Sequence, residues 1–333
     1  MIPTIIEQIE RHRNFLVASH THPDGDAIGS LLATGLALRA MGKTVHLFNE
    51  SPIPAVYRFL PSVHTIVPHI DPEMAFDVAI VLDCGDIERV GQAAAHIRQA
   101  PLLINIDHHV TNTRFGHLSL VDEAACATAE IIHRIIQRMP VKIDCAMATA
   151  IYTGILTDTG SFRFSNTNRA AFAICEAMIS RGANPYEVAQ HVYGTYSLGR
   201  IKLLNLALDS LEIAPNGKVS VMTLTQRMLR ETRTQAEDID GLINYARRIE
   251  DIKVAALIHE LGGPDNGARG KGRSQFHVSL RSDGTVDVAR IAAQYGGGGH
   301  TSASGFSIEA TLPELKQQLM GLACTDPELC AGP

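Results

Sequence analysis

The chain of 333 residues has no tryptophan, few cysteines and no long apolar run. Its six cysteines are scattered and none forms a CxxC pair, so we expect a reduced, cytoplasmic protein without a disulfide framework. No apolar run approaches the roughly 20 residues that a membrane span needs. The N-terminal stretch MIPTIIEQIERHRNF has acids within its apolar part and no small-residue cleavage site, which is atypical of a signal peptide. The sequence therefore predicts no membrane partner.

An excess of positive charge is also missing. The 29 lysines and arginines are outnumbered by 35 aspartates and glutamates, which gives a net charge of -6. A protein that coats nucleic acid through its overall charge needs the opposite balance. We therefore expect no long nucleic acid as a partner. A small anionic ligand held by a few local cations stays compatible with this composition.

Short apolar runs alternate with helical segments in the first part of the chain. The strand-like runs cover residues 14–20, 44–48, 77–86 and 101–107, and the helical segments cover about 27–43, 87–99 and 125–138. This alternation is typical of βαβ units, in which a mainly parallel sheet is flanked by helices. The predicted fold class is therefore α/β.

The later part of the chain predicts a second domain. A more helical region extends from about residue 144 to 209, and the turn signal Ala214-Pro215-Asn216-Gly217 follows it. Strand-like runs then return at 218–224, 252–261 and 275–282, with helices at about 286–295 and 312–322. We predict a first domain over residues 1–190, a helical linker over 191–214 and a smaller α/β domain over 215–333.

Acidic and imidazole side chains follow the strand-like runs at their carboxyl ends. In an open parallel sheet these ends meet at one edge, where ligands bind. One carboxylate after an apolar helix, in GILTDTGSF, could reach the same edge. The candidate residues are His20, Asp24, Asp26, Asp83, Asp107, His108, His109 and Asp158.

Single members of this set have simpler interpretations. Asp26 could be the N-cap of the helix that follows it, and Asp83 could form a turn at the end of a strand. Three polar residues at 107–109 that end an apolar run are harder to explain in this way, because burying them without a partner costs free energy. Their joint occurrence at equivalent strand ends favours a shared ligand.

Divalent cations are the ligand that this residue mixture favours. Carboxylates placed a few ångströms apart raise one another's pKa and cannot all ionise without counter-charge. Carboxylate oxygen with a few imidazole nitrogens, and no thiolate, suits manganese better than structural zinc. Two such ions can share one carboxylate and one water, whose pKa they lower, and they stabilise charge on a phosphoryl group. We expect two Mn2+ ions in the site, with Mg2+ or Co2+ as substitutes.

A glycine-rich stretch, YGGGGHTSASGF, is a second candidate site. The glycines at 296–299 can take positive φ and let backbone N–H groups converge on an anion, and His300 can add a donor. The alternative is a flexible linker, although four glycines are few for one. The stretch predicts an anion-binding loop in the second domain.

Together these motifs resemble a known family. SHTHPDGDAIGS, VLDCGD, NIDHHVTN and GILTDTGSFRF resemble the four successive motifs of the DHH phosphoesterase superfamily, and GGGGHTSASGF resembles the glycine-rich motif of its DHHA1 domain. The resemblance spans about residues 14–307 and is greatest to the bifunctional oligoribonuclease and PAP phosphatase (nanoRNase) branch, where PAP is 3'-phosphoadenosine 5'-phosphate. It implies a DHH domain, a helical linker and a substrate-binding DHHA1 domain.

The resemblance also implies a role for each candidate residue. One metal ion would be held by His20, Asp24 and Asp83. The other would be held by Asp26, Asp83, His108 and Asp158. The DHH motif itself would carry the catalytic residues Asp107, His108 and His109, with Asp107 orienting an imidazole. The substrate would be bound by His109, Arg281, Gly297, Gly298 and His300.

The activity implied by the resemblance is hydrolysis of short RNA or DNA oligonucleotides from an end to mononucleotides, and of PAP to AMP. Binding of a terminal nucleotide, with little basic surface beyond it, would favour short substrates. Three alternatives stay open: a phosphodiesterase for cyclic di-AMP or its linear product pApA, a family II inorganic pyrophosphatase and a non-catalytic nucleotide sensor. A RecJ-type exonuclease is not expected, because it would usually carry an additional nucleic-acid-binding domain. A pyrophosphatase favours a lysine-rich C-terminal phosphate site, whereas the nearest lysine here is Lys271. The oligomeric state is also open, with a homodimer among the options.

Overall fold

The structure is a computed structural model that describes residues 1–71, 74–194, 196–262, 273–325 and 329. The chain divides into two compact units, residues 1–195 and 196–333, and each is described by itself. Helix α8 (Leu198–Asp209) falls in the second unit by its contacts. The limits of the linker at 191–214 stay a prediction.

A six-stranded parallel sheet forms the centre of the first unit, in the order β3-β2-β1-β4-β5-β6. Its strands are β1 (Asn14–Ser19), β2 (Thr44–Phe48), β3 (Ile66–Val67), β4 (Val78–Leu82), β5 (Leu102–Asp107) and β6 (Leu118–Val121). The chain moves outward from β1 to β3 and then returns to place β4 beside β1. Ligands bind at the carboxyl ends of strands beside such a switch point.

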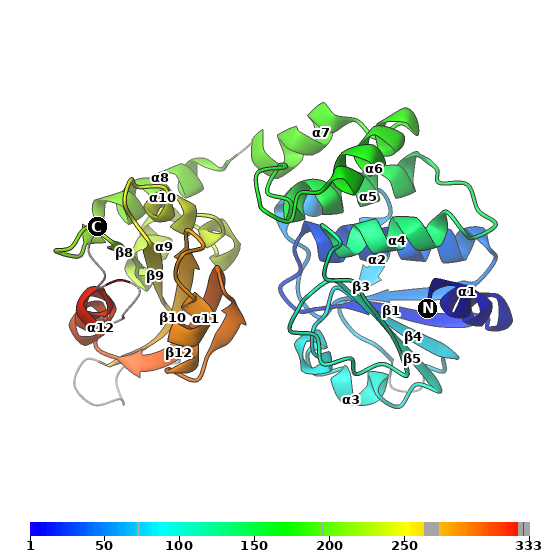
Figure 1. The fold of residues 1–333 in the computed structure, drawn as a ribbon, viewed down its shortest axis with the longest axis horizontal. Coiled ribbons are helices and arrows are strands. Elements are labelled where there is room, and N and C mark those ends of the chain that lie inside the picture. Colours follow the sequence, from blue (N-terminus) through cyan, green and yellow to red (C-terminus); the bar gives the residue numbers. More distant parts are fainter. Residues whose placement is uncertain (72–73, 195, 263–272, 326–328, 330–333) are drawn as a thin grey trace. The chain divides into compact units, whose positions relative to one another are not determined.

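Helices cover both faces of this sheet, as Figure 1 shows for α2 and α4 on one face and α3 on the other. The helices are α1 (Ile2–Arg11), α2 (Gly25–Ala40), α3 (Ala94–Ile97), α4 (Thr128–Ile136), α5 (Cys145–Asp158), α6 (Arg169–Ser180) and α7 (Pro185–Ala189). Shorter turns of 3-10 or π type lie at Ala55–Tyr57, Val63–Thr65, Ile87–Val90 and Gln190–Gly194. Because both faces are covered, consecutive residues of β1 are buried in two different cores: Phe15 and Val17 in one, Leu16 and Ala18 in the other.

Helices α2 and α5 pack unusually closely, and glycine makes this possible. A Cβ atom at Gly29 would lie 2.4 Å from the carbonyl oxygen of Ala150, and one at Gly25 would lie 2.4 Å from Oγ1 of Thr157. The carboxyl end of α5 is therefore held beside the amino end of α2. Both ends carry candidate site residues.

The predicted α/β class and the parallel sheet are confirmed, while one predicted helix and one alternative interpretation are wrong. Residues 87–99 do not form one helix: a 3-10 turn ends at Gly91, whose φ of 96° interrupts the run, and α3 follows as a single turn. Asp26 is not the N-cap of α2. The helix begins at Gly25, and the Asp24 side chain accepts hydrogen bonds from the backbone N–H groups of Asp26 and Ala27, each at 3.0 Å.

The second unit contains a six-stranded mixed sheet in the order β11-β12-β10-β9-β8-β7. Its strands are β7 (Glu212–Ile213), β8 (Val219–Leu224), β9 (Val254–Glu260), β10 (Ser274–Ser282), β11 (Gly298–His300) and β12 (Ala303–Ala310). Only β8 and β9 pair in parallel among the described strand pairs of this sheet. This arrangement confirms the predicted second, smaller α/β domain.

Helices also cover both faces of the second sheet. Helix α8 shares one apolar core with α9 (Gln226–Thr232) and α10 (Ile243–Arg247), and the other core contains α11 (Val288–Ala293) and α12 (Leu312–Thr325). A 3-10 turn lies at Ala236–Ile239. Within the described ranges of the whole chain, no helix has the length and apolar character required to cross a membrane.

Candidate metal centre

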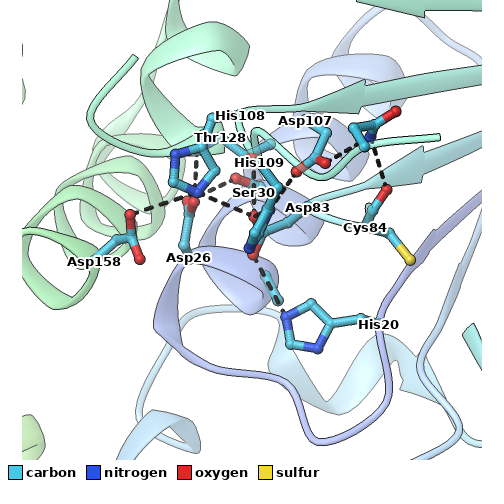
Figure 2. Close-up of polar contacts among 12 residues, drawn as sticks. His20, Asp26, Ser30, Asp83, Cys84, Asp107, His108, His109, Thr128 and Asp158 are labelled. Carbon is cyan, nitrogen blue, oxygen red and sulfur yellow. Dashed lines mark hydrogen bonds and ion pairs between the residues drawn. The ribbon is translucent and has the colours of Figure 1, made fainter. Parts of the chain in front are cut away.

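The candidate site lies at the carboxyl ends of β1, β4 and β5, beside the switch point of the first sheet. His20 directly follows β1, Asp83 directly follows β4, and Asp107 is the last residue of β5. Asp158 is the last residue of α5. Figure 2 shows that these side chains, together with that of Asp26 from α2, point toward a common region.

Three overlapping groups of side chains could each hold a metal ion, because the ligand atoms within each group lie within 4.8 Å of one another. The groups are His20, Asp24 and Asp83; Asp26, His108 and Asp158; and Asp83, His108 and His109. The structure thus brings together all six side chains that the sequence proposed as metal ligands.

Asp83 lies between the first two groups. Its Oδ2 atom is 3.6 Å from Nε2 of His20, and its Oδ1 atom is 3.7 Å from Nε2 of His108. The backbone of Asp83 has a φ of 53°, a left-handed conformation that costs free energy for a residue with a Cβ atom. The residue is 1% exposed. Asp83 is therefore a buried aspartate whose two oxygens face different ligand groups, so it could serve both.

Two of the histidines have their rings fixed by backbone carbonyl groups. Nδ1 of His20 lies 2.8 Å from the carbonyl oxygen of Thr21, and Nδ1 of His108 lies 3.3 Å from that of Ala125. When Nδ1 donates in this way, Nε2 carries the free lone pair and faces the carboxylates. Both rings are therefore oriented as metal-binding imidazoles are.

His109 has a different partner. Its Nδ1 atom lies 2.7 Å from Oδ1 of Asp107, whose other oxygen accepts a hydrogen bond from the Asn112 side chain at 2.6 Å. Burial lowers the pKa of His109, but the hydrogen bond to Asp107 and the charges of Asp83 and Asp107 together outweigh it and raise the pKa to about 9. His109 therefore carries a proton at neutral pH in this arrangement.

The carboxylates of the site cannot all be ionised without a counter-charge. Burial, followed by the charge of Asp83, raises the pKa of Asp26 well above its ordinary value. Burial likewise raises the pKa of Asp158 to about 7. Burial also acts against ionisation of Asp83, yet its pKa is lowered because the imidazoles of His20 and His109 favour the charged form. Divalent cations would remove this conflict.

The donor chemistry also fits a divalent cation. The three groups offer carboxylate oxygen and imidazole nitrogen and no sulfur, a set that suits Mn2+ and related ions. The thiol of Cys84 is adjacent to Asp83 in the sequence, but burial raises its pKa to about 12, so it stays protonated. The residues present thus fit a carboxylate–imidazole metal centre.

Sequence reasoning missed several residues that contact the ligands. Thr128 donates its hydroxyl hydrogen to Asp83 and its backbone N–H to Asp26, at 2.9 Å and 2.6 Å. The amide of Asn166 donates to Oδ2 of Asp158 at 3.2 Å. No local pattern marks Thr128, because Asp26 lies 102 positions earlier in the chain.

The second candidate site is built on three neighbouring strands, β10, β12 and β11. Arg281 of β10 and His300 of β11 both pair with Ala303 of β12, so the register places them on one face of the sheet. Gly297 is needed for close approach, since a Cβ there would lie 2.2 Å from the carbonyl oxygen of Gly305. The glycine-rich stretch is thus partly an edge strand. Lys271 lies outside the described residues.

The parallel sheet thus carries carboxylates and imidazoles beside its switch point, an arrangement that fits a metal-dependent hydrolase of phosphate esters. Comparison with known families agrees: residues 14–155 match the DHH family, N-terminal domain, and residues 216–323 match the DHHA1 domain. The chain belongs to the DHH family of phosphoesterases, with a DHHA1 domain following the DHH domain.

Individual proteins extend this likeness over most of the chain. The bifunctional oligoribonuclease and PAP phosphatase NrnA of Thermus thermophilus is 31% identical over 293 residues, which cover 88% of this chain and 83% of that protein. The crystal structure of an exopolyphosphatase-related protein from Bacteroides fragilis has a TM-score of 0.87 at 27% identity, covering 97% of this chain and 96% of that one. The exonuclease RecJ, solved bound to manganese, shares the fold alone, with a TM-score of 0.56 at 13% identity over 99% of this chain and 96% of that one.

Proposed function

We propose that this protein uses two divalent cations, Mn2+ in the first instance, to hydrolyse short oligonucleotides to mononucleotides and PAP to AMP. The position of Asp83 carries the proposal. One of its oxygens faces the group of His20 and the other faces the group of His108, at 3.6 Å and 3.7 Å. A single buried carboxylate with this orientation supports a pair of ions over a single one.

Bound cations at this place would neutralise the carboxylates, lower the pKa of a water molecule and stabilise charge on the phosphoryl group. The side chains that would hold them are those of the two groups joined by Asp83: His20, Asp24, Asp26, Asp83, His108 and Asp158.

His109 would act on the substrate. Its Nδ1 atom is held by Asp107 at 2.7 Å, and in the proposed complex the N–H group at Nε2 would donate to a phosphate oxygen. A protonated imidazole adds a positive charge beside the phosphate and can stabilise the charge that develops there. Asp107 would keep this proton in place and fix the orientation of the ring.

The choice of a short substrate rests on different evidence. The Thermus thermophilus relative is named as an oligoribonuclease and PAP phosphatase. In the second unit, Arg281 and His300 share a sheet face beside the closely packed glycine-rich stretch. We propose that Arg281, Gly297, Gly298 and His300 bind the terminal nucleotide. No extended run of cations is needed for a substrate of a few nucleotides.

A Mn2+-supplemented assay tests the proposal. PAP, pApA, cyclic di-AMP, pyrophosphate and RNA oligomers of increasing length are compared at equal concentration. We expect turnover of PAP and of dimers to pentamers, with a decline for longer strands. Equal turnover of long single strands would contradict the preference for short substrates, and turnover of pyrophosphate alone would favour the pyrophosphatase alternative.

Three substitutions separate an enzyme from a nucleotide sensor. Asp107→Ala, His108→Ala and Asp158→Ala are each expected to abolish turnover while the fold is kept, which circular dichroism checks. Full activity in all three variants would overturn the catalytic role of this centre.

A further inference from the structure

Thr128, the first residue of α4, contacts a carboxylate from each of the two ligand groups. Its hydroxyl donates to Oδ1 of Asp83 at 2.9 Å, and its backbone N–H donates to Oδ2 of Asp26 at 2.6 Å. Thr128 is fully buried, and Figure 2 shows its side chain beside those of Asp83 and His108. It therefore joins two ligands that come from separate elements, α2 and the loop after β4.

The hydroxyl of Thr128 bears on how the carboxylate of Asp83 is turned, because it donates a hydrogen bond to one of the two oxygens. Rotation about the last side-chain bond of an aspartate has a broad and weak preference, so the residue by itself does not fix the plane of its carboxylate. A hydrogen bond to Oδ1 removes this freedom. It holds Oδ1 on the side of His108 and thereby Oδ2 on the side of His20. Each oxygen has two lone pairs, so Oδ1 keeps one for a cation.

The same segment fixes Asp26. The backbone N–H of Ala129 donates to Oδ1 of Asp26 at 2.9 Å, so that each oxygen of this carboxylate has one donor from the first turn of α4. The carbonyl oxygen of Ala125, three residues before Thr128, lies 3.3 Å from Nδ1 of His108. Residues 125–129 therefore contact three proposed ligands.

We propose that Thr128 is a positioning residue that sets the orientation of the shared carboxylate of Asp83 between the two cations. The inference rests on the proposed two-ion centre and goes beyond it, because it makes the affinity and mutual spacing of the ions depend on a hydroxyl that touches neither substrate nor cation. A purely structural Thr128 would instead support the start of α4, and its loss would lower stability alone.

Thr128→Val removes the hydroxyl and keeps the shape of the side chain. We expect Mn2+ affinity, measured by titration calorimetry, to fall by about 10- to 100-fold at one or both ions, as is typical when a group that orients a metal ligand is lost. We also expect the electron paramagnetic resonance spectrum of the coupled Mn2+ pair to change. Thr128→Ser keeps the hydroxyl and should bind two ions with near wild-type affinity and spectrum.

Thr153→Val is the matched control. Thr153 is also fully buried, and its hydroxyl donates at 2.8 Å to the carbonyl oxygen of Thr149 in its own helix, α5. The variant should match the wild type in Mn2+ binding whatever its stability. Thr128→Ala is a second variant that removes the hydroxyl without a buried branched side chain, and it should weaken Mn2+ binding as Thr128→Val does.

Two outcomes would count against the inference in different ways. If the Thr128→Val and Thr128→Ala variants bind two Mn2+ ions with unchanged affinity and an unchanged electron paramagnetic resonance spectrum, the role of Thr128 is overturned. The proposed function is left intact by that result. A wild-type protein that binds no pair of ions would overturn the proposed metal centre itself, and this inference with it.

Discussion

Gly154 of α5 lies directly against the carboxylate of Asp26 on α2. A Cβ atom at position 154 would be 2.9 Å from Oδ1 of Asp26 and 2.7 Å from Cβ of Ala129 on α4. Three helices therefore meet at a point where no side chain fits, and this point holds both a proposed metal ligand and the helix turn that hydrogen-bonds to it. Packing and metal binding depend on each other here.

Gly154→Ala should disturb both the packing of the three helices and the position of the Asp26 carboxylate. We expect a loss of about 1–3 kcal/mol of unfolding free energy, which is typical of an overpacked core. We also expect kcat to fall at least about tenfold, since a displacement of about 1 Å in a reacting geometry can cost about 100-fold. Gly321→Ala in α12 is the control, because an added Cβ there would meet no atom within 4 Å among the described residues, apart from its chain neighbours and the backbone of its own helix. Wild-type stability and kcat in Gly154→Ala would contradict the close packing described.

Asp107→Asn should impair His109 without impairing metal binding. Asp107 belongs to none of the three ligand groups, but its hydrogen bond is the largest of the interactions that raise the pKa of His109, followed by the charge of Asp83. We expect kcat to fall about 10- to 100-fold, as for other groups that orient a catalytic-site histidine, with Mn2+ affinity kept. A raised pKa keeps His109 protonated to higher pH, so the loss should be larger at pH 8.5 than at pH 6.5.

The control for this substitution is Asp122→Asn, which alters a carboxylate paired with Arg134 at 2.6 Å. It should leave kcat and its pH dependence near wild type. An Asp107→Asn variant with the same fractional activity at both pH values would argue against a protonated His109.

His133 of α4 should make the first unit sensitive to acid. Burial, followed by the charge of Arg181, lowers its pKa to about 4 from an ordinary value of 6.5, and its Nδ1 atom has no hydrogen-bond partner among the described residues. The unfolded chain therefore takes up a proton at higher pH than the folded one. The stability contribution is complete above pH 6.5 and is lost as the pH falls from about 6.5 to about 4.

Urea unfolding of the metal-free protein between pH 7.5 and 4 measures this effect. The wild type should lose roughly 3 kcal/mol more than His133→Leu over this range, since one pKa unit corresponds to 1.36 kcal/mol. The comparison with His133→Leu cancels the titration of carboxylates that both proteins share. Parallel pH profiles for the two proteins would show that His133 takes up its proton at the same pH in the folded and unfolded chain, which would contradict a lowered pKa.

Mn2+ should stabilise the first unit selectively. All three ligand groups found among the described residues lie in residues 1–195. At 100 times its dissociation constant, a ligand that binds only the folded state adds about 2.7 kcal/mol. Hydrogen exchange should therefore slow in α2, α4 and α5 and stay unchanged in β8–β10, and EDTA should reverse the effect. Equal protection of both units would contradict a site confined to the first.

The sequence by itself determined the parallel sheet and predicted which side chains gather at one edge of it. Strand-like runs and their polar ends are local patterns, and parallel strands bring their carboxyl ends to one edge whatever the details of packing. For this reason the sequence alone predicts that His20, Asp83 and His108 lie together. Local patterns were less reliable where a single glycine decides the outcome, as at Gly91, which divides the expected helix at 87–99.

Only the tertiary structure decided how these groups are oriented and which residues support them. The start of α2 at Gly25 makes Asp24 the N-cap and leaves Asp26 to be bound by the first turn of α4, which lies about 100 positions further along the chain. The contacts of Thr128 and Gly154 arise because α2, α4 and α5 pack at one point. Such contacts depend on the positions of three helices at once, and no periodicity or spacing within one segment encodes them.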